Sequence, residues 1–460
     1  MTNPAALPAD FVWGTATASY QIEGAVDEDG RGPSIWDTFV RTPGAISDGT
    51  VGDVADDHYH RYAEDIALLA SMGFNAYRFS IAWPRIQPTG TGAANQAGLD
   101  FYRRIAETCH EHGITPWATL YHWDLPQPLE DEGGWLNLDT AAAFRDYAAI
   151  THDALGDVIS HWITLNEPWC SAFLGYGNGV HAPGKQLGTE AFKAAHHLLL
   201  GHGLAINAMR ESRHADSTLG ITVNLYSVRA ASDSEVDREA ARRTDGIGNR
   251  LFLDPLLLAE YPRDVLLDAG LTDWFDERSG DLEVISAPVD FMGINYYSRH
   301  TAAGPEDGVF ADPTVPSAAP GSENVRMVDT GAPKTHMGWE IHPDGLVDVV
   351  AMVHERGGDD LPIYITENGA AYPDEVGADG QVDDEERRHY FEQHMAACAD
   401  AVAQGLPLRG YFAWSLMDNF EWAFGFSRRF GLIYVDYETQ VRTVKKSGLW
   451  FRDFLAAQKS

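Results

Sequence analysis

The sequence predicts an α/β protein that folds into a closed (β/α)₈ barrel. Apolar stretches with the composition of strands begin near Phe11, Asn75, Thr115, His161, Gly220, Asp290, Pro362 and Leu408. Each is followed by an amphipathic helical pattern or a long loop, and this alternation is typical of a parallel sheet. Eight such repeats favour closure into a barrel.

The helical patterns and the chain length indicate how the barrel is elaborated. Amphipathic runs occupy residues 56–72, 99–112, 140–155, 191–209, 384–403 and 443–457. A barrel of this type needs about 250 residues, so the chain carries long insertions, the longest between the fifth and seventh strands. The Gly-, Pro- and Asp-rich stretch 302–333 is too short to separate two domains, and we interpret it as a loop beside the active-site mouth. Residues 1–460 are therefore predicted to form a single domain.

Charge and cysteine content limit the partners and the compartment. The chain has 33 basic and 68 acidic residues, a formal charge of −35. Nucleic acid and anionic membranes are excluded as partners because binding them needs a basic surface. Cys109, Cys170 and Cys398 are scattered and show no disulfide or zinc spacing, which favours a reducing compartment. With neither a signal-like amino terminus nor an apolar run of membrane-spanning length, a cytoplasmic protein is predicted.

Two of the predicted strands end in a glutamate. The apolar run 158–163 leads into Thr164-Leu165-Asn166-Glu167-Pro168, where proline ends the strand because it has no N–H for the ladder. The run from residue 361 leads into Glu367 and is followed by Gly369. Barrels keep their chemistry at the carboxyl ends of their strands. The two glutamates therefore suggest a carboxylate pair in one cleft, the basis of glycoside hydrolysis.

The other strands also carry polar or aromatic side chains at or near their ends. Arg78 is a cation inside an apolar strand and needs a carboxylate partner, a role that a catalytic glutamate would fill. Any one of these strand-end side chains could have a purely structural role, but together they favour binding of a polyhydroxylated ring. The set comprises Gln21, Arg78, His122, Trp123, Asn166, Asn224, Asn295, Tyr297, Trp414, Glu421 and Trp422.

Two other patterns have plainer interpretations. His58 and His60 are spaced like metal ligands, but they begin a helical run, so we interpret them as helix-surface or core residues. The stretch 175–179 is glycine-rich, lacks a basic residue or Walker pattern, and is predicted to be a loop. Neither a metal nor a cofactor is predicted.

From Phe11 to about Phe451 the chain resembles the family 1 glycoside hydrolases, and it is most similar to their bacterial β-glucosidases. The resemblance is carried by residues 11–24, by the two glutamate motifs at 164–168 and 365–369, and by the segments 414–422 and 430–437. These motifs occur in the order found in the family.

The resemblance implies a retaining β-glycosidase that acts by double displacement. It would release terminal, non-reducing β-D-glucosyl residues from β-glucosides and short β-linked oligosaccharides, and would also accept β-galactosides and β-fucosides. Glu167 would be the general acid/base and Glu367 the nucleophile, with Arg78 and the Tyr297 hydroxyl favouring the ionised nucleophile. Retention requires carboxyl groups about 5–5.5 Å apart.

The resemblance also implies a substrate site with two sides. Asn166 would hold the sugar 2-OH, and Trp414 would lie under the ring. The remaining residues on the sugar side would be Gln21, His122, Trp123, Asn295, Glu421, Trp422 and Phe430. The leaving-group side would be formed by Trp169, His181, Asn224 and Trp339.

Three alternatives are weighed against this hypothesis. Relatives acting on 6-phosphorylated sugars replace the acid at position 421 and add a Lys and a Tyr, where this chain has Arg428 and Phe430. The Glu421 carboxylate would repel a phosphate dianion. A non-catalytic sugar-binding barrel is disfavoured because both glutamates and Arg78 are kept. A metal-dependent hydrolase would need clustered ligands, and among the strand ends only His122 is suitable.

Overall fold

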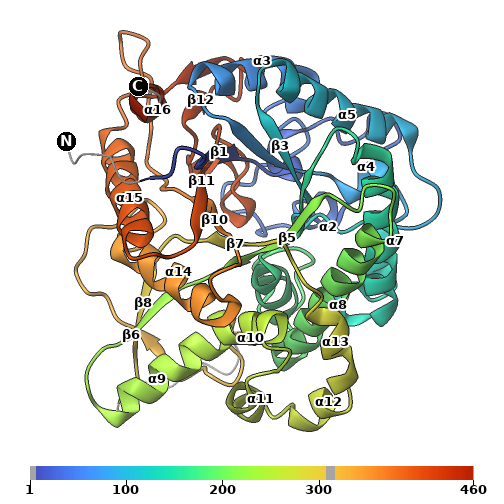
Figure 1. Cartoon of the computed structure of the whole chain (residues 1–460), viewed down its shortest axis with the longest axis vertical. Coiled ribbons are helices and arrows are strands. Elements are labelled where there is room, and N and C mark those ends of the chain that lie inside the picture. The colour runs from blue at the N-terminus through green and yellow to red at the C-terminus, as the bar shows by residue number, and fades with distance from the viewer. Residues whose placement is uncertain (1–6, 307–315, 459–460) are drawn as a thin grey trace.

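The computed structural model describes residues 7–306 and 316–458. Its central feature is a closed, parallel barrel with the strand order β1-β11-β10-β7-β5-β4-β3-β2 (Figure 1). The fold prediction is confirmed, and each strand begins within two residues of its predicted start. The barrel strands are β1 (Val12–Ala16), β2 (Ala76–Ser80), β3 (Thr115–Tyr121), β4 (His161–Asn166), β5 (Thr218–Asn224), β7 (Phe291–Asn295), β10 (Ile363–Asn368) and β11 (Leu408–Trp414).

Long helices surround the barrel, as Figure 1 shows. All but the helix at Asp344–Gly357, which was not predicted, correspond to the predicted amphipathic runs. They are α3 (His58–Ser71), α5 (Gln96–Glu111), α7 (Leu138–Leu155), α8 (Ala191–Arg210), α14 (Asp344–Gly357), α15 (Glu385–Ala403) and α16 (Lys446–Gln458). The shorter helices are α1 (Ser19–Ile22), α2 (Ile35–Phe39), α4 (Trp83–Ile86), α6 (Gln127–Asp131), α9 (Glu235–Asp245), α10 (Leu251–Leu257), α11 (Arg263–Ala269), α12 (Thr272–Asp276) and α13 (Leu282–Ile285).

Three local predictions are wrong. The last helical run does not begin at residue 443, because β13 (Arg442–Val444) pairs there with β12 (Ile433–Val435). The stretch 175–179 is not wholly a loop, since its first three residues complete a π-helix, η2 (Cys170–Gly177). The stretch 302–333 includes the end of β8 (Arg299–Ala303) and all of β9 (Arg326–Met327), which form a small sheet with β6 (Ser227–Ala230).

The longest insertions lie between β5 and β10, as predicted. Residues 307–315 of the stretch that was interpreted as a mouth loop lie outside the described residues. That the chain forms one domain stays a prediction. Within the described ranges, no helix has the length and apolar character needed to cross a membrane.

Aromatic side chains fill the barrel interior. The Trp117 ring on β3 stacks on His161 at 4.3 Å and contacts Phe291, Tyr364 and Phe412 at centroid distances of 4.9–5.2 Å. These residues come from β3, β4, β7, β10 and β11, so the interior is packed rather than open, as in other barrels of this kind. Room for a ligand is therefore left at the carboxyl ends of the strands.

Candidate active site

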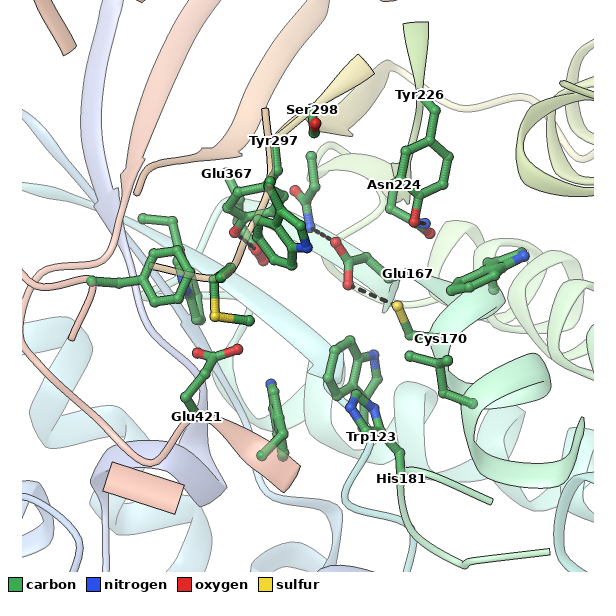
Figure 2. A pocket seen from close by; sticks show the side chains of 18 of the residues that line it. Trp123, Glu167, Cys170, His181, Asn224, Tyr226, Tyr297, Ser298, Glu367 and Glu421 are labelled. Atoms are coloured by element: carbon green, nitrogen blue, oxygen red, sulfur yellow. Dashed lines mark hydrogen bonds between the residues drawn. The ribbon is translucent and has the colours of Figure 1, made fainter. Parts of the chain in front are cut away.

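A pocket opens at the carboxyl ends of the strands and contains most of the predicted site residues (Figure 2). Gln21, Arg78 and Asn166 are not in its lining; they are fully buried next to lining residues, to which two of them hydrogen-bond directly. The predicted residues that line the pocket are His122, Trp123, Glu167, Trp169, His181, Asn224, Asn295, Tyr297, Trp339, Glu367, Trp414, Glu421, Trp422 and Phe430.

Glu167 occupies the junction between β4 and the following helix. The strand ends at Asn166 and the helix starts at Pro168, a position that suits proline because no N–H is needed there. The Glu167 backbone has φ 47°, in the left-handed region, and the pocket residues Trp123 (φ 76°) and Trp422 (φ 46°) share this feature. Each such residue costs about 1 kcal/mol or more and persists only where its surroundings enforce it, commonly at functional sites.

Glu367 is the second-last residue of β10, and its carboxylate is held from two sides. Arg78 Nη1 donates to Oε1 at 2.7 Å, and the Tyr297 hydroxyl donates to Oε2 at 2.7 Å. The chain passes very close to β11 just beyond, and a Cβ on Gly369 would come within 1.8 Å of the Trp414 carbonyl oxygen. Glycine is therefore required at the point where the strand releases Glu367 into the pocket.

Arg78 is buried and fully engaged, as expected for a cation inside a strand. Besides Glu367 it donates to Asn166 Oδ1 at 2.6 Å, to the Thr366 carbonyl at 3.0 Å and to Thr119 Oγ1 at 3.2 Å. The predicted carboxylate partner is present. A buried pair of this kind is stable only with such additional hydrogen bonds.

The two glutamates have different electrostatic environments, although both point into the same cavity (Figure 2). Burial and the charge of Glu367 raise the pKa of Glu167 to about 8. Burial also raises the pKa of Glu367, but Arg78 and Tyr297 oppose that increase. Glu367 therefore ionises first and Glu167 keeps its proton at neutral pH. This division of a carboxylate pair is what an acid and a nucleophile need.

We expect kcat/KM for an aryl β-glucoside to fall as pH rises through about 8, because the productive form needs protonated Glu167. Removing the neighbouring charge with Glu367→Gln should lower the pKa of Glu167, which ¹³C NMR titration of labelled glutamate would report. Titration of Glu167 near the ordinary glutamate value in the wild type would contradict this account. Because the sites interact, the measured values belong to the pair.

The pKa of Glu421 is raised to a similar value, so its contribution to the pH profile must be separated from that of Glu167. Burial and the charges of Glu367 and Glu167 raise the pKa of Glu421 to about 8. The high-pH limb of the kcat/KM profile should remain in Glu421→Gln and vanish in Glu167→Gln. The raised pKa also means that Glu421 is largely neutral at pH 7 in the empty site.

Asn166 fixes the tautomer of His122. The Asn166 amide nitrogen lies 3.0 Å from His122 Nε2, and because this nitrogen can only donate, Nε2 accepts. Burial and the Arg78 charge hold the pKa of His122 well below its usual value, so the ring is neutral and Nδ1 carries the hydrogen. That N–H is directed to no other group within the described part of the chain and is available to a ligand hydroxyl.

Several further buried polar atoms at this site lack a hydrogen-bond partner among the described residues. Buried polar atoms are normally satisfied, so each exception calls for an explanation. Gln21 illustrates the arrangement, since its amide nitrogen donates to Asn419 Oδ1 and the Phe420 carbonyl while its oxygen is left to accept. A ligand rich in hydroxyls would pair with such atoms where they face the pocket. The set comprises Gln21 Oε1, His122 Nδ1, Trp169 Nε1, His181 Nδ1, Asn224 Oδ1 and Glu421 Oε2.

Aromatic rings provide the apolar surface of the pocket. Trp414 and Trp422 both stack on His122, with interplanar angles of 22° and 21°. The Trp123 indole N–H donates to the Asn166 carbonyl at 2.9 Å, so a sugar hydroxyl would have to share it. Phe430 packs against Tyr297 and Trp339, at 6.2 and 6.3 Å between ring centroids. Sugar rings stack on surfaces of this kind.

Sequence reasoning missed several residues of the pocket wall. Cys170 donates its thiol to Glu167 Oε2 at 3.3 Å. Tyr226 and His300 stack at 4.0 Å but come from separate insertions, so no sequence spacing links them. The remaining unpredicted lining residues are Leu174, Val180, Leu225, Ser298, Met337 and Phe424.

The described residues offer no obvious metal centre. In residues 7–306 and 316–458 no group of three or more His, Cys, Asp or Glu side chains is placed to hold a metal ion. His58 hydrogen-bonds to buried Asp65, while exposed His60 contacts Asp57 and Glu28. The sequence interpretation of these histidines as core and surface residues fits this placement. The absence of a metal or cofactor from the function stays a prediction.

Comparisons with known proteins agree with the geometry. A family model described as "Glycosyl hydrolase family 1" matches residues 3–460. The chain is 49% identical to a bifunctional β-D-glucosidase/β-D-fucosidase of Bifidobacterium breve, covering 98% of each chain. It superposes on the AHE enzyme of Alicyclobacillus herbarius with a TM-score of 0.92 and 50% identity, over 100% of both chains. For a β-glucosidase of Thermotoga maritima in complex with castanospermine, the TM-score is 0.91 and the identity 45%, over 98% of this chain and 99% of the other. Together with the barrel and its carboxylate pair, these matches show that the chain belongs to glycosyl hydrolase family 1.

Proposed function

We propose that this glycosyl hydrolase releases terminal, non-reducing β-D-glucosyl residues from β-glucosides and short β-linked oligosaccharides, with retention of configuration. The observation that carries the proposal is the pair Glu167 and Glu367, which face one pocket and differ in how strongly they hold a proton. Two carboxyl groups with divided roles at one glycosidic bond are the requirement for this chemistry.

In the first half-reaction, Glu367 attacks the anomeric carbon while Glu167 gives its proton to the departing oxygen. Arg78 and Tyr297 keep both oxygens of Glu367 hydrogen-bonded in its ionised form. The product of this step is a covalent glycosyl-enzyme ester and a free alcohol.

In the second half-reaction, water replaces the ester. Formation of the ester removes the charge of Glu367, which is one of the two effects, with burial, that raise the pKa of Glu167. Glu167, now a carboxylate, takes a proton from water as the water attacks the anomeric carbon. Inversion at each step gives net retention.

The glucosyl unit is held by the polar atoms that the protein leaves unpaired. In this proposal Gln21, His122 and Glu421 bind ring hydroxyls, with Trp414 as the surface under the ring. Asn166 contacts the 2-OH, and Asn295 links Asn166 to Glu167. The leaving group lies against Trp169, His181, Asn224 and Trp339, which line the same pocket.

Substitution of Glu421 tests the sugar side of the site. Glu421→Ser should lower kcat/KM for an aryl β-glucoside by about 10- to 100-fold, because hydrogen bonds to the sugar's O4 and O6 are lost. The loss should be smaller for the matching β-D-fucoside, which lacks the 6-hydroxyl and has an axial 4-hydroxyl. Steady-state kinetics on the two substrates measure both effects. Unchanged turnover of the glucoside would show that Glu421 does not bind the sugar.

The proposal extends to related substrates and to location. The Bifidobacterium breve relative is named as both a glucosidase and a fucosidase, which supports acceptance of β-fucosides, and we include β-galactosides. Oligosaccharides released in cellulose degradation are one source of the proposed substrates. Cys109, Cys170 and Cys398 are all buried free cysteines, which supports a reducing, cytoplasmic compartment.

A further inference from the structure

The hydrogen bonds around Glu167 identify which of its oxygens carries the catalytic proton. The Arg78 guanidinium can only donate, so the Asn166 atom facing it at 2.6 Å is an oxygen. The Asn295 atom that contacts this oxygen at 3.0 Å must then be nitrogen, and the same nitrogen donates to Glu167 Oε1 at 2.8 Å. Oε1 therefore accepts in both protonation states, and the exchangeable proton belongs on Oε2.

The group beside Oε2 is the thiol of Cys170. Cys170 lies three residues after Glu167 in the first turn of the helix, and its backbone N–H donates to the Glu167 carbonyl at 3.0 Å. Its sulfur lies 3.3 Å from Oε2, and Figure 2 shows the contact beside the cavity. Cys170 is 8% exposed and lines the pocket.

We propose that Cys170 is a positioning residue whose thiol holds Oε2 of Glu167 in both halves of the reaction. A thiol is a weak donor and a weak acceptor. When Oε2 is ionised, the S–H donates to it and keeps the carboxylate aimed at the incoming water. When Oε2 carries the proton, the sulfur is an acceptor weak enough to yield that proton to a glycosidic oxygen. The inference rests on the proposed acid/base role of Glu167.

The chemistry of the thiol suits this role. Burial and the Glu167 charge raise the pKa of Cys170 well above its usual value, so the sulfur stays protonated and adds no charge to the site. The other titratable or charged groups that act on this pair, among the described residues, are Arg78 on β2, Glu367 on β10, Glu421 after β11, Tyr226 after β5 and Tyr297 after β7.

The test compares pH profiles of kcat/KM for an aryl β-glucoside. In Cys170→Ala the carboxylate loses a donor, so the high-pH limb should move up by about 0.5 unit. In Cys170→Ser a hydroxyl, a stronger donor than a thiol, should move it down. Cys398→Ala removes a buried thiol on α15 that is not part of the pocket lining, and it should leave the profile unchanged.

The inference would be overturned if the high-pH limbs of the kcat/KM profiles coincided in all variants. It would also be overturned if Cys170→Ala and Cys170→Ser moved the limb in the same direction. Glu167→Gln separates this failure from that of the proposed function. If the high-pH limb persists in Glu167→Gln, the acid/base assignment fails. If the high-pH limb vanishes in Glu167→Gln but is not shifted by substitution of Cys170, only the inference about the thiol fails.

A spectroscopic measurement avoids substitution at Cys170 altogether. The chain has three cysteines, so Cys109→Ala/Cys398→Ala leaves Cys170 as the sole thiol. Its S–H stretching band should move to lower wavenumber as pH rises through the high-pH limb, because the S–H then donates to a carboxylate. A band that does not respond to pH across that range would overturn the inference.

Discussion

Glu367→Gly is expected to reduce hydrolysis of an aryl β-glucoside on the order of 10⁵-fold, as for loss of other covalent nucleophiles. Steady-state and single-turnover assays measure the loss. The space left by the carboxylate admits azide, which should attack the anomeric carbon from that side and give the α-glucosyl azide. The variant should also use α-glucosyl fluoride, whose configuration resembles that of the missing intermediate.

The control compares two buried glutamates that each accept a tyrosine hydroxyl. Glu367 accepts from Tyr297, and Glu130, which lies outside the pocket lining, accepts from Tyr176. Glu367→Gln should be nearly inactive and Glu130→Gln active, with both variants folded by circular dichroism. Comparable activity in the two variants would refute the nucleophile assignment. So would formation of the β-azide by Glu367→Gly.

Glu167→Ala should discriminate between leaving groups. Loss of a general acid costs about 10²–10⁴-fold where protonation of the departing oxygen is essential, as in cellobiose or alkyl glucosides. An aryl leaving group that departs as a stable anion needs little protonation, so its first step should be slowed far less. The measurement is kcat/KM across a series of leaving groups of increasing pKa.

The second half-reaction gives an independent check on the same variant. With the base absent, an activated aryl substrate should give a burst of released aryl alcohol, and the glycosyl-enzyme should then accumulate. Azide needs no base, so it should accelerate turnover and yield the β-glucosyl azide. Equal losses for good and poor leaving groups would contradict the acid role of Glu167.

The sequence predicted the strand ends well because residue chemistry sets them locally. Pro168 lacks the N–H that would extend β4, and Gly369 is required by its close approach to the Trp414 carbonyl. The partner of Arg78 was predictable from the cost of burying an unpaired cation, and the structure supplies Glu367. These arguments need only a residue and its neighbours along one strand.

Other features depend on packing that no local pattern records. The strands β6, β8 and β9 are four, five and two residues long, too short for a clear alternation of side chains. The contact from Cys170 to Glu167 depends on the phase of the helix after Pro168, which a sequence motif does not give. The raised pKa of Glu421 arises from burial and from the charges of Glu367 and Glu167, a property of the assembled barrel alone.

Proton NMR during turnover of an aryl β-glucoside tests the central claim of a carboxylate pair acting by double displacement. The spectrum, recorded before mutarotation, identifies the glucose anomer that forms first. Retention through Glu367 predicts β-glucose first, with α-glucose appearing only later. If α-glucose forms first, water attacks the substrate directly across a wider pair of carboxylates, and Glu367 is not the nucleophile.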